Sequence, residues 1–254
     1  MNRLTDNPLI VFALALFVLW LSARIGSFFL ERRKLEAGVR EDFIAILAAT
    51  LTLLGLIIGF SFSMAIRGYE QRQDYEEAEA NAIGTEYLRA DLLPAADAAK
   101  VRALLRNYVD ERILFYNTRD EQRLRQINAT TTQLHIDLWN AIHAQATAQP
   151  TPVVALVISG MNDVLNSQGA ARAAWSNRIP IEAWGLMALI AICCNLLVGY
   201  RAHRPEAEGI LMIVLPIVVS ISFFYIADID SPRVGIIRVQ PQNLVSVAQS
   251  LQAR

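Results

Sequence analysis

The residues whose types and spacing most suggest a function lie in the apolar stretch from Phe43 to Ile66, which contains no charged residue. Small side chains recur at intervals of three and four, and bulky ones recur beside them at intervals of four. The small residues are Thr52, Gly55, Gly59 and Ser63. The bulky residues are Leu56, Phe60 and Met64. Small residues at this spacing let helices pack closely in lipid, and bulky apolar residues around an axis can form a hydrophobic constriction in an ion pathway.

Two interpretations of this stretch follow, and they are compatible. In the first, Gly55, Gly59 and Ser63 pack against other helices. In the second, symmetric copies of the chain surround a pore. The predicted pore-lining residues are then Thr52, Leu56, Phe60, Met64 and, at the mouth, Arg67. Identical subunits would form such a ring, because a heterologous interface closes by rotation.

Charged residues follow the apolar stretch directly. They include Arg72, Asp74, Glu76, Glu77 and Glu79. Such a cluster could form a cation site or a charged vestibule. The four-residue spacing of Arg72 and Glu76 favours instead a solvated helix face, on which each ion pair stabilises the helix by about 0.3 kcal/mol.

A second charged group lies near the C-terminus and consists of Asp228, Asp230, Arg233 and Arg238. Carboxylates at this spacing could coordinate a cation. We expect instead that they pair with one another or with arginines of the middle region, and so anchor the C-terminal tail.

Nothing in the sequence predicts catalysis. His135 and His143 lie two helical turns apart, which is too far to chelate one metal ion. Cys193 and Cys194 are adjacent within an apolar segment, where neither a disulfide framework nor a zinc site is plausible. No serine–histidine–aspartate set or phosphate-binding loop is recognisable. We therefore expect no catalytic residue, no metal site, no cofactor and no enzyme activity, and the net charge of −1 argues against nucleic acid as a partner.

The elements that must position these residues are membrane spans. A helix needs about 20 predominantly apolar residues to cross a bilayer. Four segments qualify: Pro8 to about Leu30, Phe43 to Ile66, Ala183 to Tyr200, and Gly209 to Ala227. We interpret the first as a retained span, because its apolar run is too long for a signal peptide and basic residues follow it. The lipid bilayer is therefore a predicted partner.

The middle region, residues 67–180, is predicted to be a helical bundle. Its prolines divide it into a continuation of the second span to Leu93 and three amphipathic helices. These cover Ala95–Asn117, Asp120–Gln149 and Val153–Asn177. The predicted fold is all-α, with a hairpin of spans at 1–66, the bundle at 67–180, a second hairpin at 181–228 and a tail at 229–254.

The side of the membrane that holds the bundle is predicted from basic residues. The two short loops between spans carry Arg32, Arg33, Lys34, Arg40, Arg201 and Arg204, whereas the N-terminus carries Arg3. Basic residues in short loops favour the cytoplasm. This places the bundle on the non-cytoplasmic side of a bacterial inner membrane, although arginines at the ends of the bundle oppose that placement.

Several sequence blocks resemble the bacterial bestrophin-like family. They are GFSFSMA at 59–65, EANAIGTEYLRADLLP at 79–94, Arg178-Ile179-Pro180 before Trp184, Gly199-Tyr200, and the pattern from Asp228 to Pro241. The resemblance covers nearly the whole chain.

A more distant resemblance to the bestrophins themselves lies in the order of elements and in Gly59-Phe60, followed by Arg67. Bestrophins are pentameric anion channels whose second membrane segment forms an apolar neck. The resemblance implies a homo-oligomeric ion channel of about five copies that conducts inorganic ions, with anions expected. Two features depart from the bestrophin pattern, because Thr52 is polar where the neck is apolar and the acidic calcium clasp has no clear counterpart.

An alternative hypothesis is a non-conducting scaffold or envelope sensor whose bundle binds a partner. The long surface of the bundle and the absence of charge inside the spans support it.

Overall fold

The computed structural model describes residues 6–30, 37–201 and 205–253. Within these ranges the chain is helical almost throughout and contains no strand, which confirms the predicted all-α fold. The helices are α1 (Pro8–Leu30), α2 (Ala37–Arg89), the short 3₁₀ helix η2 (Ala90–Leu92), α3 (Ala95–Asn117), α4 (Glu121–Ala148), α5 (Pro152–Ser176), α6 (Ile181–Arg201), α7 (Pro205–Asp230) and α8 (Gln242–Gln252).

The chain divides into two compact units. The first consists of Met1–Gly68 and Arg178–Ile237, and the second consists of Tyr69–Asn177 and Arg238–Arg254. The C-terminal segment therefore belongs to the same unit as the middle region. The four-part division with boundaries at residues 66, 180 and 228 stays a prediction.

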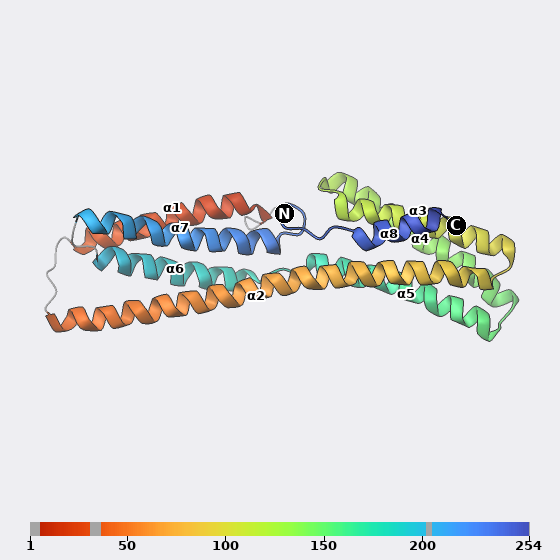
Figure 1. The fold of residues 1–254 in the computed structure, drawn as a ribbon, viewed down its shortest axis with the longest axis horizontal. Helices are drawn as coiled ribbons and strands as arrows, with labels where there is room; N and C mark the ends of the chain where they lie inside the picture. Colours follow the sequence, from red (N-terminus) through yellow and green to blue (C-terminus); the bar gives the residue numbers. More distant parts are fainter. Residues whose placement is uncertain (1–5, 31–36, 202–204, 254) are drawn as a thin grey trace. The chain divides into compact units, whose positions relative to one another are not determined.

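The first unit contains the apolar helices. Among the described residues, four helical stretches are long and apolar enough to cross a membrane, and each overlaps one of the four predicted spans. Figure 1 shows α1, α6 and α7 side by side, and each of these helices contacts the other two. Aromatic rings fill two of these interfaces, where Trp184 packs edge-on against Phe223 and Phe12 packs against Phe224. The predicted multi-pass membrane protein is thus confirmed at the level of its spans.

Helices α1 and α6 approach each other closely at their backbones. A Cβ atom added at Gly26 would overlap the backbone of Leu196, and one added at Gly199 would overlap the backbone of Ala23. Glycine at both positions lets the two helices touch along their backbones, as small residues do in lipid. The sequence does not predict this contact, because each glycine stands alone and not in a series of small residues at helical spacing.

Helix α2 is one uninterrupted helix of 53 residues. It contains the second predicted span and continues through the charged residues that follow, as predicted. It ends in the 3₁₀ turn η2 before Pro94, whose ring cannot continue a helix.

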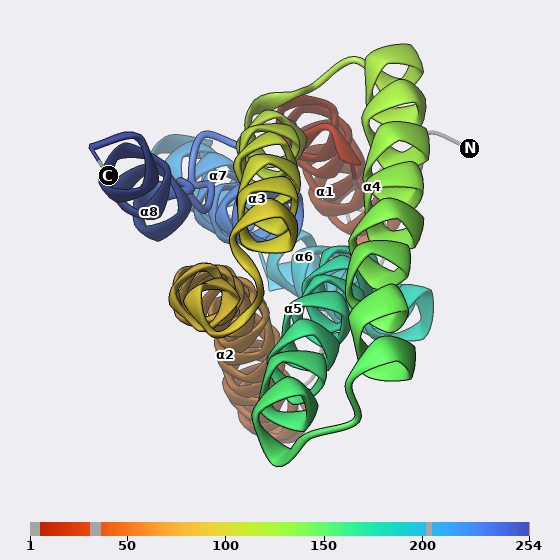
Figure 2. The same cartoon turned by 90° about the vertical axis from the view of Figure 1, so that its right-hand side faces the viewer.

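The second unit packs α3 between α4 and α8, and α4 against α5 (Figure 2). Capping residues explain two helix starts, because the side chains of Asp120 and Thr151 accept hydrogen bonds from the first turns of α4 and α5. The core of this unit includes the fully buried Val101, Leu105, Leu138, Met161 and Leu244. Leu244 lies on α8, so the predicted C-terminal tail is in part a helix of this core.

The two short loops whose basic residues carry the prediction of sidedness lie largely outside the described residues. The loop segments 31–36 and 202–204 contain Arg32, Arg33, Lys34 and Arg204.

We expect Gly199→Ala to lower the thermal stability of the detergent-solubilised protein. The added methyl group has to push the backbones of α1 and α6 apart, and overpacking of this kind costs about 1–3 kcal/mol. Gly185→Ala on the same helix is the matched control, because the space around Gly185 is open. Equal melting temperatures for the two variants would contradict the close packing.

Candidate functional site

The predicted pore-lining residues share one face of α2, and this face is exposed within the single chain. Leu56 is 53% exposed, Phe60 is 60% exposed and Met64 is 49% exposed. Thr52 is also exposed, and its hydroxyl donates to the carbonyl oxygen of Ala48 at 2.9 Å on its own helix. The hydroxyl is therefore satisfied without a partner from another helix.

The opposite face of α2 is the one that the chain buries. It includes Leu47, Leu54, Ser61 and Ala65, of which each is at most 5% exposed. Their spacing of seven and four residues keeps them on one side of the helix. Helix α2 therefore has an inner face that packs within the chain and an outer face whose partner has to come from outside the chain.

The predicted helix-packing residues lie on this outer face too. No described atom lies within 4 Å of the position that a Cβ atom would take at Gly55 or Gly59, and Ser63 is exposed. Among the described residues, Gly55 and Gly59 therefore pack against no other helix. Packing by this stripe stays a prediction about neighbouring copies of the chain.

The outer face becomes charged after the apolar residues. Arg67 is exposed, and the exposed residues Glu70, Asp74 and Glu77 follow it at helical spacing. The prediction of a solvated face is wrong for three of the charged residues near them. Arg72, Glu76 and Glu79 are each at most 1% exposed and lie inside the second unit.

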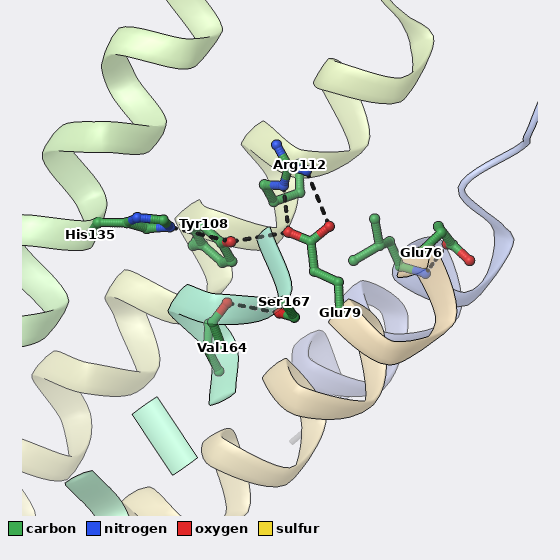
Figure 3. Close-up of polar contacts among 8 residues, drawn as sticks. Glu76, Glu79, Tyr108, Arg112, His135, Val164 and Ser167 are labelled. Atoms are coloured by element: carbon green, nitrogen blue, oxygen red, sulfur yellow. Dashed lines mark hydrogen bonds and ion pairs between the residues drawn. The ribbon is translucent and has the colours of Figure 1, made fainter. Parts of the chain in front are cut away.

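Glu79 is the centre of a buried polar network (Figure 3). Its carboxylate accepts hydrogen bonds from Arg112 Nε at 2.5 Å, from Arg112 Nη2 at 3.1 Å and from the Tyr108 hydroxyl at 3.0 Å. The Tyr108 hydroxyl also lies 3.4 Å from Nε2 of His135. Burial and the neighbouring Glu79 carboxylate raise the pKa of Tyr108 well above its usual value, so the hydroxyl keeps its proton.

The guanidinium of Arg112 is further stabilised by an aromatic ring. It lies 4.4 Å from the centroid of the Phe115 ring, which is a favourable geometry for a cation–π contact. A buried ion pair repays its desolvation only when its remaining groups are also well placed. Two hydrogen bonds between Arg112 and Glu79, the Tyr108 hydroxyl and the Phe115 ring contribute to that placement here, while Arg112 Nη1 has no hydrogen-bond partner among the described residues.

Glu76 holds the start of α8. Its carboxylate accepts hydrogen bonds from the backbone N–H of Leu244 at 2.9 Å and from the Asn243 side chain at 2.7 Å. A carboxylate at a helix N-terminus satisfies free N–H groups and complements the helix dipole. Burial nevertheless raises the pKa of Glu76 above its usual value. At the other end of α8, Arg106 Nε donates to the carbonyl oxygen of Leu251 at 3.1 Å.

Glu86 is buried in a different way, because neither of its carboxylate oxygens has a hydrogen-bond partner among the described residues. The side chain is fully buried against α5, where a Cβ atom at Gly160 would overlap both Glu86 and Arg89. Burial raises the pKa of Glu86 to about 8, the Arg89 charge opposes this shift, and the Asp163 charge adds to it. The carboxyl group therefore holds a proton at neutral pH.

The predicted tail-anchoring residues act mainly within the first unit. Asp230 accepts hydrogen bonds from Arg178 Nε at 2.8 Å and from the backbone N–H of Ile179 at 3.1 Å. Asp228 accepts from the backbone N–H groups of Ile236 and Ile237. Arg178, at the end of the bundle sequence, is the partner of Asp230.

Metal binding finds no support in the described parts of the chain. No group of three or more histidine, cysteine, aspartate or glutamate side chains lies there in an arrangement that could hold a metal ion.

Comparison with known proteins adds to this geometry. A profile of the bestrophin-like domain matches residues 9–244. No curated protein matches the chain. A crystal structure of a bacterial bestrophin homologue from Klebsiella pneumoniae superimposes with a TM-score of 0.67 at 13% identity, over 96% of this chain and 97% of that one. A mutant of a bestrophin homologue from the same organism gives 0.66 at 14% identity, over 94% and 97%. At these identities, the structural likeness is one of fold.

We expect the folded protein to lose stability as pH rises from about 4.5 to about 8, in part through Glu86. Its pKa is raised in the folded state, so the fold binds the proton more tightly than the unfolded chain does. This contribution is fully present below the unfolded pKa and is lost as pH rises through the folded pKa. Glu86→Gln keeps the shape of the protonated side chain and removes its titration.

Thermal unfolding of the full-length protein between about pH 5 and about pH 9 measures this effect. The melting temperature of Glu86→Gln should fall less over this range than that of the wild type. Glu77→Gln is the matched control, because Glu77 is exposed on the same helix. Parallel curves for wild type and Glu86→Gln would show that Glu86 is ionised in the fold.

Proposed function

This chain belongs to the bestrophin-like family, and from that premise we propose that it is the subunit of a homo-oligomeric ion channel whose pore is lined by α2. Five copies is the number that the bestrophin resemblance suggests. In this assembly the outer face of α2 turns toward a central axis. Leu56 and Phe60 form a hydrophobic constriction, Thr52 and Met64 line the path on either side, and Arg67 lies at its mouth.

The observation that carries the proposal is the exposure of this face. Between Phe43 and Ile66 this face carries no charge, and it bears Phe60, which is 60% exposed. The other face of the same helix is packed inside the chain. Gly55, Gly59 and Ser63 lie beside the bulky residues, so neighbouring subunits can approach closely there. One surface thus offers both an interface between copies and a lining for the space between them.

The expected ions are anions, by the resemblance to bestrophins and by the position of Arg67. The exposed carboxylates of Glu70, Asp74 and Glu77 follow Arg67 on the same face and favour cations. The sign of the conducted ion therefore depends on which of these charges lies nearest the narrowest point. Reversal potentials in a salt gradient measure it directly.

We expect Phe60→Ala to increase the single-channel conductance of the reconstituted protein several-fold, because it removes the bulkiest side chain of the proposed constriction. Phe17→Ala is the matched control, since Phe17 lies on α1 and is 59% exposed. It should leave the conductance unchanged.

No current from wild type or Phe60→Ala with any ion tried would remove the channel proposal and favour the scaffold or sensor. Native mass measurement of the detergent-solubilised protein gives the subunit count in the same preparation. A monomer or dimer would exclude a pore lined by one helix from each subunit.

We further propose that the protein resides in a bacterial inner membrane with its bundle on the non-cytoplasmic side, as the basic loops suggest. Gln122 is exposed near the start of α4, so a cysteine introduced there can react with a membrane-impermeant maleimide. Gln122→Cys should label in cells whose inner membrane is intact. Cells expressing the parent chain give the background from Cys193 and Cys194, and labelling only after permeabilisation would place the bundle in the cytoplasm.

A further inference from the structure

The segment that leaves α7 forms a turn with its polar groups inside and its apolar side chains outside. Helix α7 ends at Asp230, and residues 231–237 follow without regular helix. Asp228 is 2% exposed and Ser231 is 2% exposed, whereas Val234 is 52% exposed and Ile236 is 80% exposed. Water favours the reverse arrangement, because exposed apolar surface is costly.

Hydrogen bonds hold the backbone of this turn in place. The two carboxylate oxygens of Asp228 accept from the N–H groups of Ile236 at 2.7 Å and Ile237 at 2.9 Å. A Cβ atom at Gly235 would overlap the carbonyl oxygen of Asp228, so glycine permits the backbone to fold back onto the end of α7. The exposed isoleucines are therefore presented by a fixed framework.

The turn lies where three membrane helices end together. Arg178, just before α6, donates from Nη1 to Asp6 at 2.9 Å and from Nε to Asp230 at 2.8 Å. Ser231 Oγ also donates to the carbonyl oxygen of Asp6 at 3.0 Å. These contacts join the start of α1, the start of α6 and the end of α7, and the last of these is the end of a candidate span. A span that ends here predicts that this end of the first unit lies near the bilayer surface.

Exposed apolar side chains continue around this end. Leu9 on the first turn of α1 is 69% exposed, and Ile181 on the first turn of α6 is 64% exposed. Tyr225, five residues before the end of α7, is 49% exposed. These exposed apolar side chains lie on the helix ends that the contacts of Arg178 and Ser231 join to the turn.

We propose that Val234, Ile236 and Ile237 form an interfacial membrane anchor, whose side chains insert among the acyl chains just below the lipid headgroups. Apolar groups in that position are buried by about 5–10 Å at the boundary between headgroups and acyl chains. The occupant is lipid, because the turn directly follows the end of a candidate span. In addition, Asp228 and Ser231, which hold the turn, are buried and hydrogen-bonded. The anchor fixes the depth of the end of α7, and it does not depend on whether the protein conducts ions.

Quenching by brominated lipid tests the anchor in the full-length protein. Ile236→Trp and Ile136→Trp are reconstituted in phosphatidylcholine vesicles with and without brominated acyl chains, and the emission of the parent protein is subtracted to remove its 4 native tryptophans. Ile136 is the matched control, because it is 49% exposed on α4 of the second unit. The tryptophan introduced at position 236 should be quenched about twofold more strongly than that at position 136. Bromine near the lipid headgroup should quench it more than bromine near the end of the acyl chain.

Equal quenching at the two positions would overturn the proposal. Val234→Trp repeats the test at a second position of the turn, in case the larger side chain at 236 disturbs folding. If a second copy covers the turn, Ile236→Cys in a chain with Cys193→Ala and Cys194→Ala should form a disulfide between copies, and lipid quenching should be absent. That combined result would also overturn the anchor.

Discussion

One uninterrupted helix, α2, passes from an environment of lipid to one of water, and the rest of the structure depends on that constraint. Its backbone hydrogen bonds are satisfied along the helix in both environments, so only the side chains have to change. Between Phe43 and Ile66 the exposed positions carry no charge, whereas the exposed positions after Ile66 include the charged Arg67, Glu70, Asp74 and Glu77. The inner face remains buried along both halves, through Leu54 and Ala65 and then Glu79 and Ile83.

The cost of this continuity is seen in the second unit, where α2 buries charge. Glu79 and Arg112 are both fully buried, and desolvation of such a pair costs several kcal/mol for each ion before the geometry repays it. The hydrogen bond from Tyr108 and the ring of Phe115 contribute to that repayment. Glu86 meets the same cost differently, by retaining its proton. Polar groups on α2 thus fix which of its faces turns toward α3 and α5.

The lengths of apolar segments and the positions of prolines predict the helices well, because both are local properties of the sequence. The ends of α1 and α3 agree with the predicted residues. The direction of the charged side chains on α2 could not be predicted in this way. Arg72, Glu76 and Glu79 recur at helical spacing, as a solvated face also does, and only the packing of α3 and α8 distinguishes the two. Helix α8 was missed because it is short and its first turn depends on Glu76, far away in the sequence.

The same reasoning explains why a pore is hard to recognise from residue chemistry. The outer face of α2 needs no hydrogen-bond partner from its surroundings at these positions, because the Thr52 hydroxyl donates to its own helix and Leu56 and Phe60 are apolar. Lipid could cover such a face as readily as neighbouring subunits could. If identical copies turn this face toward a common axis, conduction depends on the symmetry of the assembly and on the width of the pore. It does not depend on any one reactive side chain. The fold itself also makes few demands on individual residues, because it is shared with a bacterial bestrophin homologue at 13% identity.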